Sequence, residues 1–261
     1  MSYIIAVANE KGGVAKTTSS ISLGAALVES GAKVLLVDLD SQANLTLALG
    51  MEPDKNQRSL ISVLLEGVAL SSIWRESGIP GLFVAPSNYE MGVAERLLPT
   101  RPGYEVTLRK VLTTQAEDYQ FIVLDCPPFL GALTLNALTA ANLLMIPTQA
   151  EYFSIYAIRN MMGLIRRVRS QHNPDLTYRL LLTMFDRRNR IHRTLAEQLQ
   201  STFGNGLLET IVETDTKLRE SPIAGMPIIY QFPKSRAAMQ YRALAQEIIQ
   251  YAQETTAQPN K

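Results

Sequence analysis

A glycine loop near the start of the chain carries the residues with the clearest chemical capacity. The loop consists of Lys11, Gly12, Gly13, Val14, Ala15, Lys16, Thr17 and Thr18. The adjacent glycines allow the backbone to turn closely around an anion, so that successive N–H groups point at phosphate oxygens. Lys16 can neutralise the β and γ phosphates, and the Thr17 hydroxyl can ligate Mg²⁺. The loop therefore predicts binding of ATP together with Mg²⁺.

Three aspartates follow apolar runs further along the chain. Asp38 and Asp40 come after the run 33–37, and Asp125 closes the run 121–124. In open α/β sheets ligands bind at the carboxyl ends of the strands, and a two-residue spacing is expected to direct Asp38 and Asp40 the same way. Asp125 resembles the Walker B aspartate of P-loop ATPases, which holds Mg²⁺ through water, and capping of the next helix is the alternative.

The glycine loop and four further segments resemble the deviant Walker ATPases of the ParA and MinD group, whose loop reads K-G-G-x-x-K-[ST]. The four segments are residues 37–42 (VDLDSQ), 123–128 (VLDCPP), 182–186 (LTMFD) and 218–222 (LRESP). The resemblance extends to the Soj-like branch of short ParA proteins and covers nearly the whole chain, with the segments in the same order. It implies a dimerising ATP hydrolase with ATP and Mg²⁺ as cofactors.

The resemblance assigns different tasks to the two lysines of the loop. Lys16 serves the nucleotide of its own subunit, whereas Lys11 reaches across a dimer interface to the partner's ATP. A cation supplied in trans acts like an arginine finger, which accelerates phosphoryl transfer by roughly 10³ to 10⁵ where measured, although lysine need not equal arginine. The alternative for Lys11 is an ordinary solvated loop lysine.

The resemblance also implies roles for residues outside the loop. Asp40 positions the attacking water, and Asp38 acts with Mg²⁺ and its hydration shell. A carboxylate with an ordinary pKa near 3.9 is a poor base for water, so orientation is the expected contribution and turnover should be slow. Met184 and Pro222 lie in segments that contact the nucleotide.

Two alanines stand where this family usually has glycine. Ala15 departs from the usual G-V-G-K-T, and Ala43 departs from D-P-Q-G-N. If either position needs a positive φ, alanine costs of order 1 kcal/mol there. Affinity or switching would then differ from that of relatives.

Short apolar, β-branched runs alternate with longer helical patterns, which is typical of a parallel sheet joined by crossover helices. The expected strands are residues 3–8, 33–37, 81–85, 121–124, 143–146 and 178–184. The expected helices are residues 17–30, 90–98, 107–117, 155–172, 192–203 and 235–254. We therefore expect an α/β fold of the P-loop NTPase type, a single-domain, doubly wound, mostly parallel sheet with helices on both faces, over residues 1–254. Residues 51–58 are expected to form a loop, and residues 255–261 a disordered tail.

The composition excludes several classes of protein. The 25 Lys and Arg residues nearly balance the 24 Asp and Glu residues, so any electrostatic function must be local. The single Cys126 excludes a disulfide framework, a cysteine metal cage and an iron–sulfur electron carrier, and it fits a reducing cytoplasm. No apolar stretch approaches the roughly 18 residues of a spanning helix, and the first run is expected to be a strand rather than a signal peptide. We therefore expect a soluble, cytoplasmic protein.

A basic region interrupts this balance, because residues 159–193 contain nine arginines against two aspartates. The arginines between 159 and 169 fit a solvated helix face as well as a binding surface. The cluster at 187–190 is more suggestive because it follows an expected strand, and Lys217 falls where Soj-like proteins carry a DNA-binding arginine. The expected DNA-binding residues are Arg187, Arg188, Arg190, Lys217, Arg219 and Arg236. Such contacts go to phosphates and read no sequence, so the implied partner is nonspecific double-stranded DNA.

Together these features indicate a cytoplasmic, nucleoid-associated ATPase that forms an ATP-dependent homodimer, binds DNA, and is released when a cargo-bound adaptor stimulates hydrolysis. With no helix-turn-helix arm before the first strand, the chain resembles both the short ParA proteins that move chromosomes or plasmids and McdA, which spaces carboxysomes. Membrane attachment like that of MinD is disfavoured, because the last expected helix carries Glu247 and Glu254 and lacks a basic polar face. An ATP-dependent metabolic ligase resembling dethiobiotin synthetase is the alternative from another functional class.

Overall fold

An eight-stranded sheet organises the part of the chain that the computed structural model describes, residues 2–53 and 58–257. The strands are β1 (Tyr3–Val7), β2 (Val34–Asp38), β3 (Arg75–Glu76), β4 (Leu82–Ala85), β5 (Phe121–Asp125), β6 (Leu143–Gln149), β7 (Thr177–Phe185) and β8 (Leu207–Glu213). Their order across the sheet is β3-β4-β2-β5-β1-β6-β7-β8. Neighbouring strands are parallel except for β3 and β4, which pair antiparallel. The six expected strands are confirmed.

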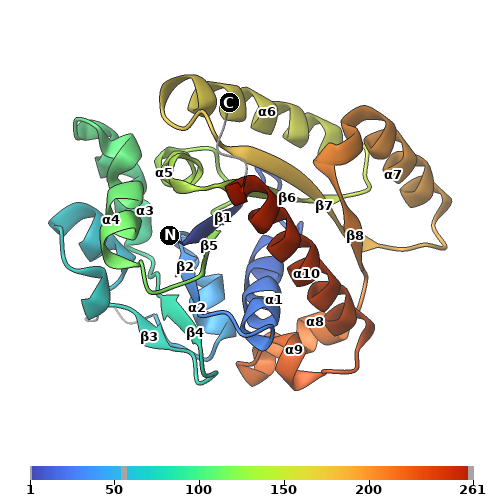
Figure 1. Cartoon of the computed structure of the whole chain (residues 1–261), viewed down its shortest axis with the longest axis horizontal. Helices are drawn as coiled ribbons and strands as arrows, with labels where there is room; N and C mark the ends of the chain where they lie inside the picture. Colours follow the sequence, from blue (N-terminus) through green and yellow to red (C-terminus); the bar gives the residue numbers. More distant parts are fainter. Residues whose placement is uncertain (1, 54–57, 258–261) are drawn as a thin grey trace.

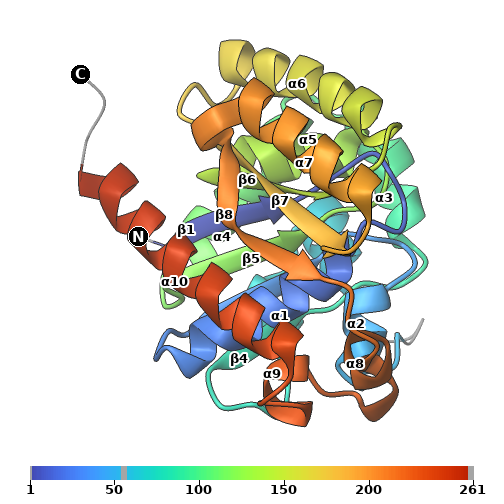
Figure 2. The same cartoon turned by 90° about the vertical axis from the view of Figure 1, so that its right-hand side faces the viewer.

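Helices cover both faces of the sheet, as Figures 1 and 2 show from two directions. They are α1 (Lys16–Glu29), α2 (Asn44–Ala48), α3 (Met91–Leu97), α4 (Thr107–Gln115), α5 (Ala132–Ala140), α6 (Ser154–Gln171), α7 (Arg190–Phe203), α8 (Lys217–Glu220), α9 (Ile228–Gln231) and α10 (Arg236–Ala257). The doubly wound α/β fold expected from the sequence is therefore confirmed.

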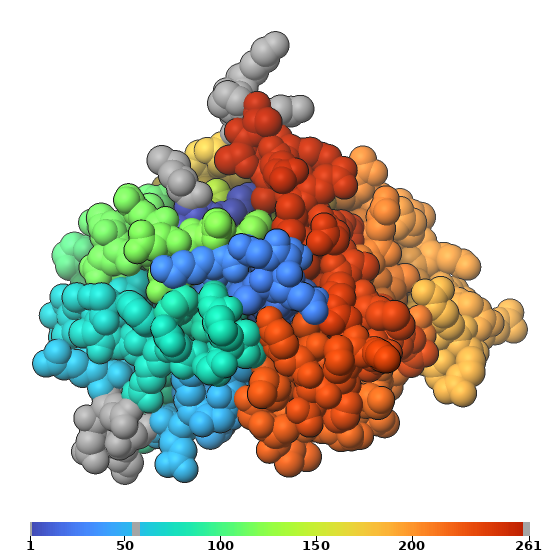
Figure 3. Space-filling model, turned by 60° about the horizontal axis from the view of Figure 1, so that its bottom comes forward, coloured from blue at the N-terminus to red at the C-terminus, as the bar shows by residue number. Residues whose placement is uncertain are grey.

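Every strand of the sheet except the short β3 contributes to two hydrophobic cores. In β1, Ile4 and Ala6 pack into the core beneath α3 to α6, whereas Ile5 and Val7 pack into the core beneath α1 and α10. This is the alternation that a pleated strand imposes, and both faces are apolar because both are covered. In Figure 3, α1 and α10 lie side by side on one face of the molecule.

The sequence prediction missed elements whose patterns are weak. Helix α5 is buried along its whole length and has apolar residues all round, so it shows no helical periodicity. Strand β8 lies at the edge of the sheet and is only partly buried, and β3 spans two residues. Helices α2, α8 and α9 have four or five residues each. None of these gives a period long enough to recognise.

Two predicted boundaries need correction. Helix α10 continues to Ala257, so the first three residues of the expected tail 255–261 are helical, and residues 258–261 lie outside the described part. Helix α7 begins at Arg190 rather than at residue 192, because Asn189 caps it by accepting a hydrogen bond from the Ile191 N–H. Of the expected loop 51–58, residues 54–57 also lie outside the described part.

The order of the strands fixes where a ligand can bind. Strand β1 pairs with β5 on one side and β6 on the other, and the chain leaves β1 directly into the glycine loop. The sheet order changes direction at this point, so the crossover helices diverge and leave a crevice at the carboxyl ends of the strands. Val7, Asp38 and Asp125 share one register there.

Candidate nucleotide site

The glycine loop opens onto a cavity of about 390 Å³, which is within the size range of small-ligand sites. The loop leads from β1 into the N-terminus of α1, where unpaired N–H groups and the helix dipole favour an anion. The lining residues include Gly12, Gly13, Ala15, Lys16, Thr17, Thr18, Asp40, Asn44, Pro128 and Pro222.

The two glycines leave open space where a side chain would begin. A Cβ atom built on Gly12 or Gly13 would meet no atom within 4 Å, and Gly13 has a φ of 73°. A ligand can therefore approach the backbone closely, as recognition of phosphate by N–H groups requires. Val14 has a different task, because it is fully buried and its carbonyl accepts a hydrogen bond from the Thr183 hydroxyl at 3.1 Å. That contact anchors the loop to β7.

The two lysines of the loop point in different directions. Lys16 is 8% exposed and lines the cavity, where its Nζ donates to the Lys11 carbonyl at 3.0 Å. Burial lowers the pKa of Lys16, and the nearby Asp125 carboxylate partly offsets this. The Lys11 side chain instead reaches the end of β6, where Nζ donates to Gln149 Oε1 at 3.0 Å and forms an ion pair with Glu151. In this geometry only Lys16 serves the cavity of its own chain.

Asp125 lies beneath the loop and binds two hydroxyls of α1. Thr17 Oγ1 donates to Asp125 Oδ2 at 2.7 Å, and Ser20 Oγ donates to Asp125 Oδ1 at 2.9 Å. Burial, followed by repulsion from Asp38, raises the pKa of Asp125 to about 7. The alternative role as a helix cap does not hold, because Glu95 accepts the N–H groups at the start of α5.

Oxygen ligands of this kind suit Mg²⁺. A hydroxyl and a carboxylate side by side fit an ion that prefers oxygen and completes its shell with water and substrate phosphates. Within residues 2–53 and 58–257 no group of three or more His, Cys, Asp or Glu side chains is placed to hold a metal ion. A dedicated protein cage is thus absent from the described part, as is usual where phosphates supply ligands.

The orientations of Asp38 and Asp40 correct the expectation that both carboxylates point the same way. Asp40 lines the cavity, and its Oδ1 accepts the Gln42 N–H at 3.0 Å. Asp38 is fully buried and accepts both the N–H and the hydroxyl of Thr46 through Oδ2, at 3.0 and 2.7 Å. The chain turns sharply after β2, so the strand alternation behind the expectation ends at Asp38. Burial raises the pKa of Asp38 to about 6.

Three residues other than glycine have a positive φ in the described chain, and all three lie around the nucleotide loop or the β2–α2 turn. Ala15 has a φ of 64°, Ala43 of 50° and Met184 of 53°. Both alanines thus have the positive φ that glycine tolerates better, so each costs of order 1 kcal/mol relative to glycine. Strained backbone of this kind concentrates at functional sites because the surrounding structure must hold it in place.

The other expected nucleotide contacts divide between two cavities. Pro222 lines the main cavity, whereas Met184 lines an adjoining cavity of about 250 Å³ that shares Gly13, Ala15 and Thr18 with it. The Met184 sulfur accepts a hydrogen bond from the Gln149 amide, which also donates to the Gly13 carbonyl.

The sequence prediction did not include three residues that hold the site together. Ser20 could have been found, because it follows Thr17 by three residues and so lies on the same helix face. Thr46 fixes Asp38, and Gln149 bridges the loop to β7. Gln149 and Thr46 gave no signal in the sequence because their partners lie far away along the chain or across a turn.

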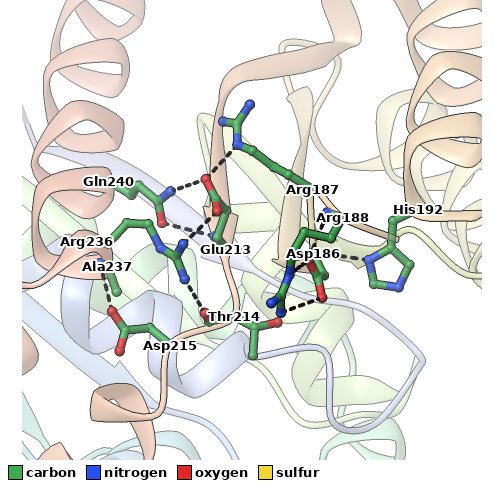
Figure 4. Close-up of polar contacts among 10 residues, drawn as sticks. All are labelled: Asp186, Arg187, Arg188, His192, Glu213, Thr214, Asp215, Arg236, Ala237 and Gln240. Atoms are coloured by element: carbon green, nitrogen blue, oxygen red, sulfur yellow. Dashed lines mark hydrogen bonds and ion pairs between the residues drawn. The ribbon is translucent and has the colours of Figure 1, made fainter. Parts of the chain in front are cut away.

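The expected DNA-binding cations are at the surface, but most of them have partners, as Figure 4 shows for three of them. Arg187 and Arg236 both pair with Glu213, and Arg188 pairs with Asp186. Lys217 Nζ lies 5.1 Å from the centre of the Phe232 ring. Arg190 is exposed at the start of α7.

Arg219 differs from the other expected cations. It is exposed, yet it lines the smaller cavity together with Gly13, Ala15 and Thr18. Arg219 therefore lies beside the nucleotide loop, as does Glu213, which lines the same cavity.

Strand β1, the loop, Lys16, Thr17 and Asp125 together define a P-loop ATPase. Comparison with known proteins agrees: the AAA domain family matches residues 2–178. The sporulation initiation inhibitor protein Soj of Bacillus subtilis is 36% identical over 249 residues, with 95% of this chain and 98% of that protein covered. The chromosome-partitioning ATPase Soj of Treponema pallidum is 37% identical over 252 residues, covering 95% and 98%. The chain belongs to the ParA/Soj family of ATPases and is an ATP hydrolase.

Solved structures share the fold over nearly the full length. A cobyrinic acid a,c-diamide synthase from Mycobacterium smegmatis with bound ATP analogue and magnesium is 34% identical, with a TM-score of 0.86 and coverage of 97% and 96%. An ATP complex of McdA from Cyanothece has a TM-score of 0.84 at 18% identity, covers 95% and 96%, and so shows the fold alone. Among the described residues, no helix combines the length and apolar character needed to cross a membrane.

Proposed function

We propose that this ATPase positions or segregates an intracellular cargo by cycling between a DNA-bound dimer and free monomers. ATP with Mg²⁺ drives dimerisation, the dimer binds duplex DNA without reading its sequence, and a cargo-bound adaptor stimulates slow hydrolysis that releases it. The site of action is the nucleoid in the cytoplasm. Its Soj relatives are named for chromosome partitioning and for inhibition of sporulation initiation, and chromosome, plasmid and protein organelle are all open as cargo.

The observation that carries this proposal is the divergence of the two loop lysines. Lys16 points into the cavity, whereas Lys11 is turned away from it toward Gln149 and Glu151. A lysine that does not serve its own site is available to the nucleotide of a second copy. The side chains of Lys11 and Glu151 are 25% and 49% exposed, so little free energy is lost when Lys11 leaves Glu151 to bind a phosphate on a partner.

Residues of the cavity divide the work of hydrolysis in this proposal. The loop N–H groups and Lys16 bind the phosphates, and Thr17 with Asp125 would hold Mg²⁺, which neutralises charge on the transferred phosphoryl group. Asp40 faces the cavity and orients the attacking water. Asp38 supports Asp40 indirectly. Its carboxylate accepts hydrogen bonds from the Asp40 N–H and from Thr46, which fix the turn that carries Asp40.

DNA binding is the part of the proposal that an experiment decides most directly. A mobility-shift titration should give a shift with ATP and none with ADP, because dimerisation doubles the cations on one face. If about four phosphates are neutralised per dimer, log K should fall with log salt at a slope of roughly −3.6. Native and scrambled duplexes should bind alike.

The matched variant reverses Lys217, Arg187, Arg188 and Arg190 to Glu. It should lose DNA binding and keep ATP-dependent dimerisation in light scattering. Retained binding with an unchanged salt slope would place the DNA surface elsewhere, and binding to anionic vesicles in its place would favour a MinD-like membrane function.

A second candidate is an ATP-dependent ligase. It is favoured by the likeness to the structures named cobyrinic acid a,c-diamide synthase, which cover 97% of this chain. Such an enzyme would turn over ATP only with a carboxylic acid acceptor and would give no shift of DNA. Failure of the wild-type protein to bind DNA with ATP, together with acceptor-dependent release of phosphate, would establish it.

A further inference from the structure

Glu213 closes strand β8 and stands at the centre of the arginine cluster in Figure 4. Its side chain is only 11% exposed, in contrast to the arginines that reach it. Arg187 Nε donates to Oε1 at 2.7 Å, and Arg236 Nη1 lies 3.0 Å from Oε2. One carboxylate therefore binds guanidinium groups from two elements that are distant in sequence, the β7–α7 turn and the start of α10.

Further hydrogen bonds make this arrangement rigid. Gln240 Nε2 donates to Glu213 Oε1 at 3.2 Å, and the Glu213 N–H donates back to Gln240 Oε1 at 3.0 Å. Arg236 Nη2 also donates to the Thr214 carbonyl at 2.6 Å. The Arg187 backbone is held in turn, since its carbonyl accepts a hydrogen bond from Arg193 Nη1 at 2.7 Å.

The arginines remain accessible despite these bonds. The Arg187 and Arg236 side chains are 66% and 53% exposed. Figure 4 shows Arg187 reaching Glu213 through Nε, with its two terminal nitrogens directed away from the carboxylate. Those terminal N–H groups form the fork that recognises phosphate. The buried acid thus fixes Arg187 through Nε and leaves its terminal nitrogens free, whereas each terminal nitrogen of Arg236 already has one partner, Glu213 or the Thr214 carbonyl, and has one further N–H to offer.

We propose that Glu213 is a positioning residue that pre-orders Arg187 and Arg236 to bind neighbouring phosphates of duplex DNA. The inference rests on the DNA binding proposed above and assigns part of that surface to a carboxylate. An arginine that is already held in place loses less conformational entropy when it binds. The acid raises affinity although its own charge repels DNA.

The direction in which DNA affinity changes when the charge of Glu213 is removed distinguishes positioning from simple electrostatics. Glu213→Gln keeps the shape of the side chain and raises the charge of each subunit by one. If the arginines act only as charges, the variant binds DNA more tightly. If Glu213 positions them, the variant binds roughly tenfold more weakly, because two side chains must be ordered on binding.

The experiment measures DNA affinity of the full-length protein with ATP by fluorescence anisotropy on a 24-base-pair duplex at two salt concentrations. Glu209→Gln is the matched control, since it removes an exposed acid from the same strand, and it should not weaken binding. In an Arg187→Gln/Arg236→Gln background, Glu213→Gln should have no further effect, because its partners are gone. The melting temperature and the ATP-dependent dimerisation of Glu213→Gln should match those of the wild type.

A second variant keeps the test decisive if Glu213→Gln folds poorly. Arg187→Lys retains the charge but loses the fork and the Nε contact, so it should weaken binding severalfold without changing dimerisation. Unchanged or tighter binding by a folded Glu213→Gln, or full binding by Arg187→Lys, overturns the inference and leaves the proposed function intact. No binding by the wild type with ATP overturns both.

Discussion

The nucleotide site and the arginine cluster around Glu213 differ in whether their charged side chains are buried or exposed. Lys16, Asp38 and Asp125 are buried, so their charged forms depend on one another and on the ligand. Arg187 and Arg188 are exposed and paired with acids, and solvent screens the charges of both arginines. Single substitutions should therefore be decisive in the first region and graded in the second.

Removal of Lys16 should produce the largest effect. Lys16→Ala deletes the buried cation of the cavity, which the loop N–H groups cannot replace, and ATP binding measured by calorimetry should fall at least a hundredfold. Arg188→Ala, on the other region, should leave ATP affinity unchanged. Wild-type affinity in Lys16→Ala would refute the assignment of the site.

Loss of Lys11 should separate binding from catalysis. Lys11→Ala should bind ATP as a monomer and lose hydrolysis by up to roughly 10³, since its charge acts on the partner's nucleotide. Glu151→Gln, which frees Lys11 from its ion pair, should instead lower the ATP concentration needed for dimerisation. Light scattering and phosphate release measure both. Normal turnover by Lys11→Ala would contradict a role in trans.

Asp40→Ala should trap the dimer. The phosphate cradle stays intact while the water loses its orientation, so hydrolysis should fall roughly a hundredfold and the ATP-bound dimer should accumulate. Asp38→Ala should in addition lower the stability of the fold, because the Asp38 carboxylate accepts hydrogen bonds from Thr46. If Asp40→Ala stays monomeric with ATP, the carboxylate has a structural task.

The buried Asp125 carboxyl should make the metal-free protein sensitive to pH. Its pKa is raised to about 7, so the folded state holds a proton that the unfolded state releases near pH 4. Stability from this group is therefore lost as pH rises from about 4 to 7. In EDTA, Asp125→Asn should be more stable than wild type by about 4 kcal/mol at pH 8, and the gain should shrink toward pH 4. A gain that does not vary with pH, measured by thermal melts, would show that the carboxyl does not titrate this way.

The smallest effect concerns the strained backbone. Ala15→Gly and Ala43→Gly should each stabilise the protein by up to about 1 kcal/mol, because both positions have a positive φ. Ala25→Gly in the middle of α1 is the control and should destabilise by more than this amount, because Ala25 has a helical backbone and its methyl group is buried in the core. Urea denaturation measures all three. Destabilisation by both loop variants would mean that the methyl groups pack usefully.

Much of the nucleotide site could be predicted from the sequence because its parts are local. The loop, the start of α1 and the aspartates at strand ends follow from short motifs and their resemblance to the family, and comparison with the family's glycines identifies the two alanines as positions of possible strain. The sheet could be predicted because β1, β2, β5 and β6 are apolar runs. Helix α5 and strand β8 could not, since burial on all sides and an edge position remove the periodic signal.

Tertiary structure decided which charges meet. Lys11 finds Glu151, and Glu213 collects Arg187 and Arg236, through pairs separated by 23 to 140 residues that no spacing rule connects. Asp38 at the end of β2 likewise points inward, and the turn that follows brings Asp40 to the cavity. The sequence by itself determined the chemistry of the phosphate loop, because backbone geometry over a few residues creates it. Only the fold decided which lysines and arginines are paired with acids, because packing of the whole sheet brings these partners together.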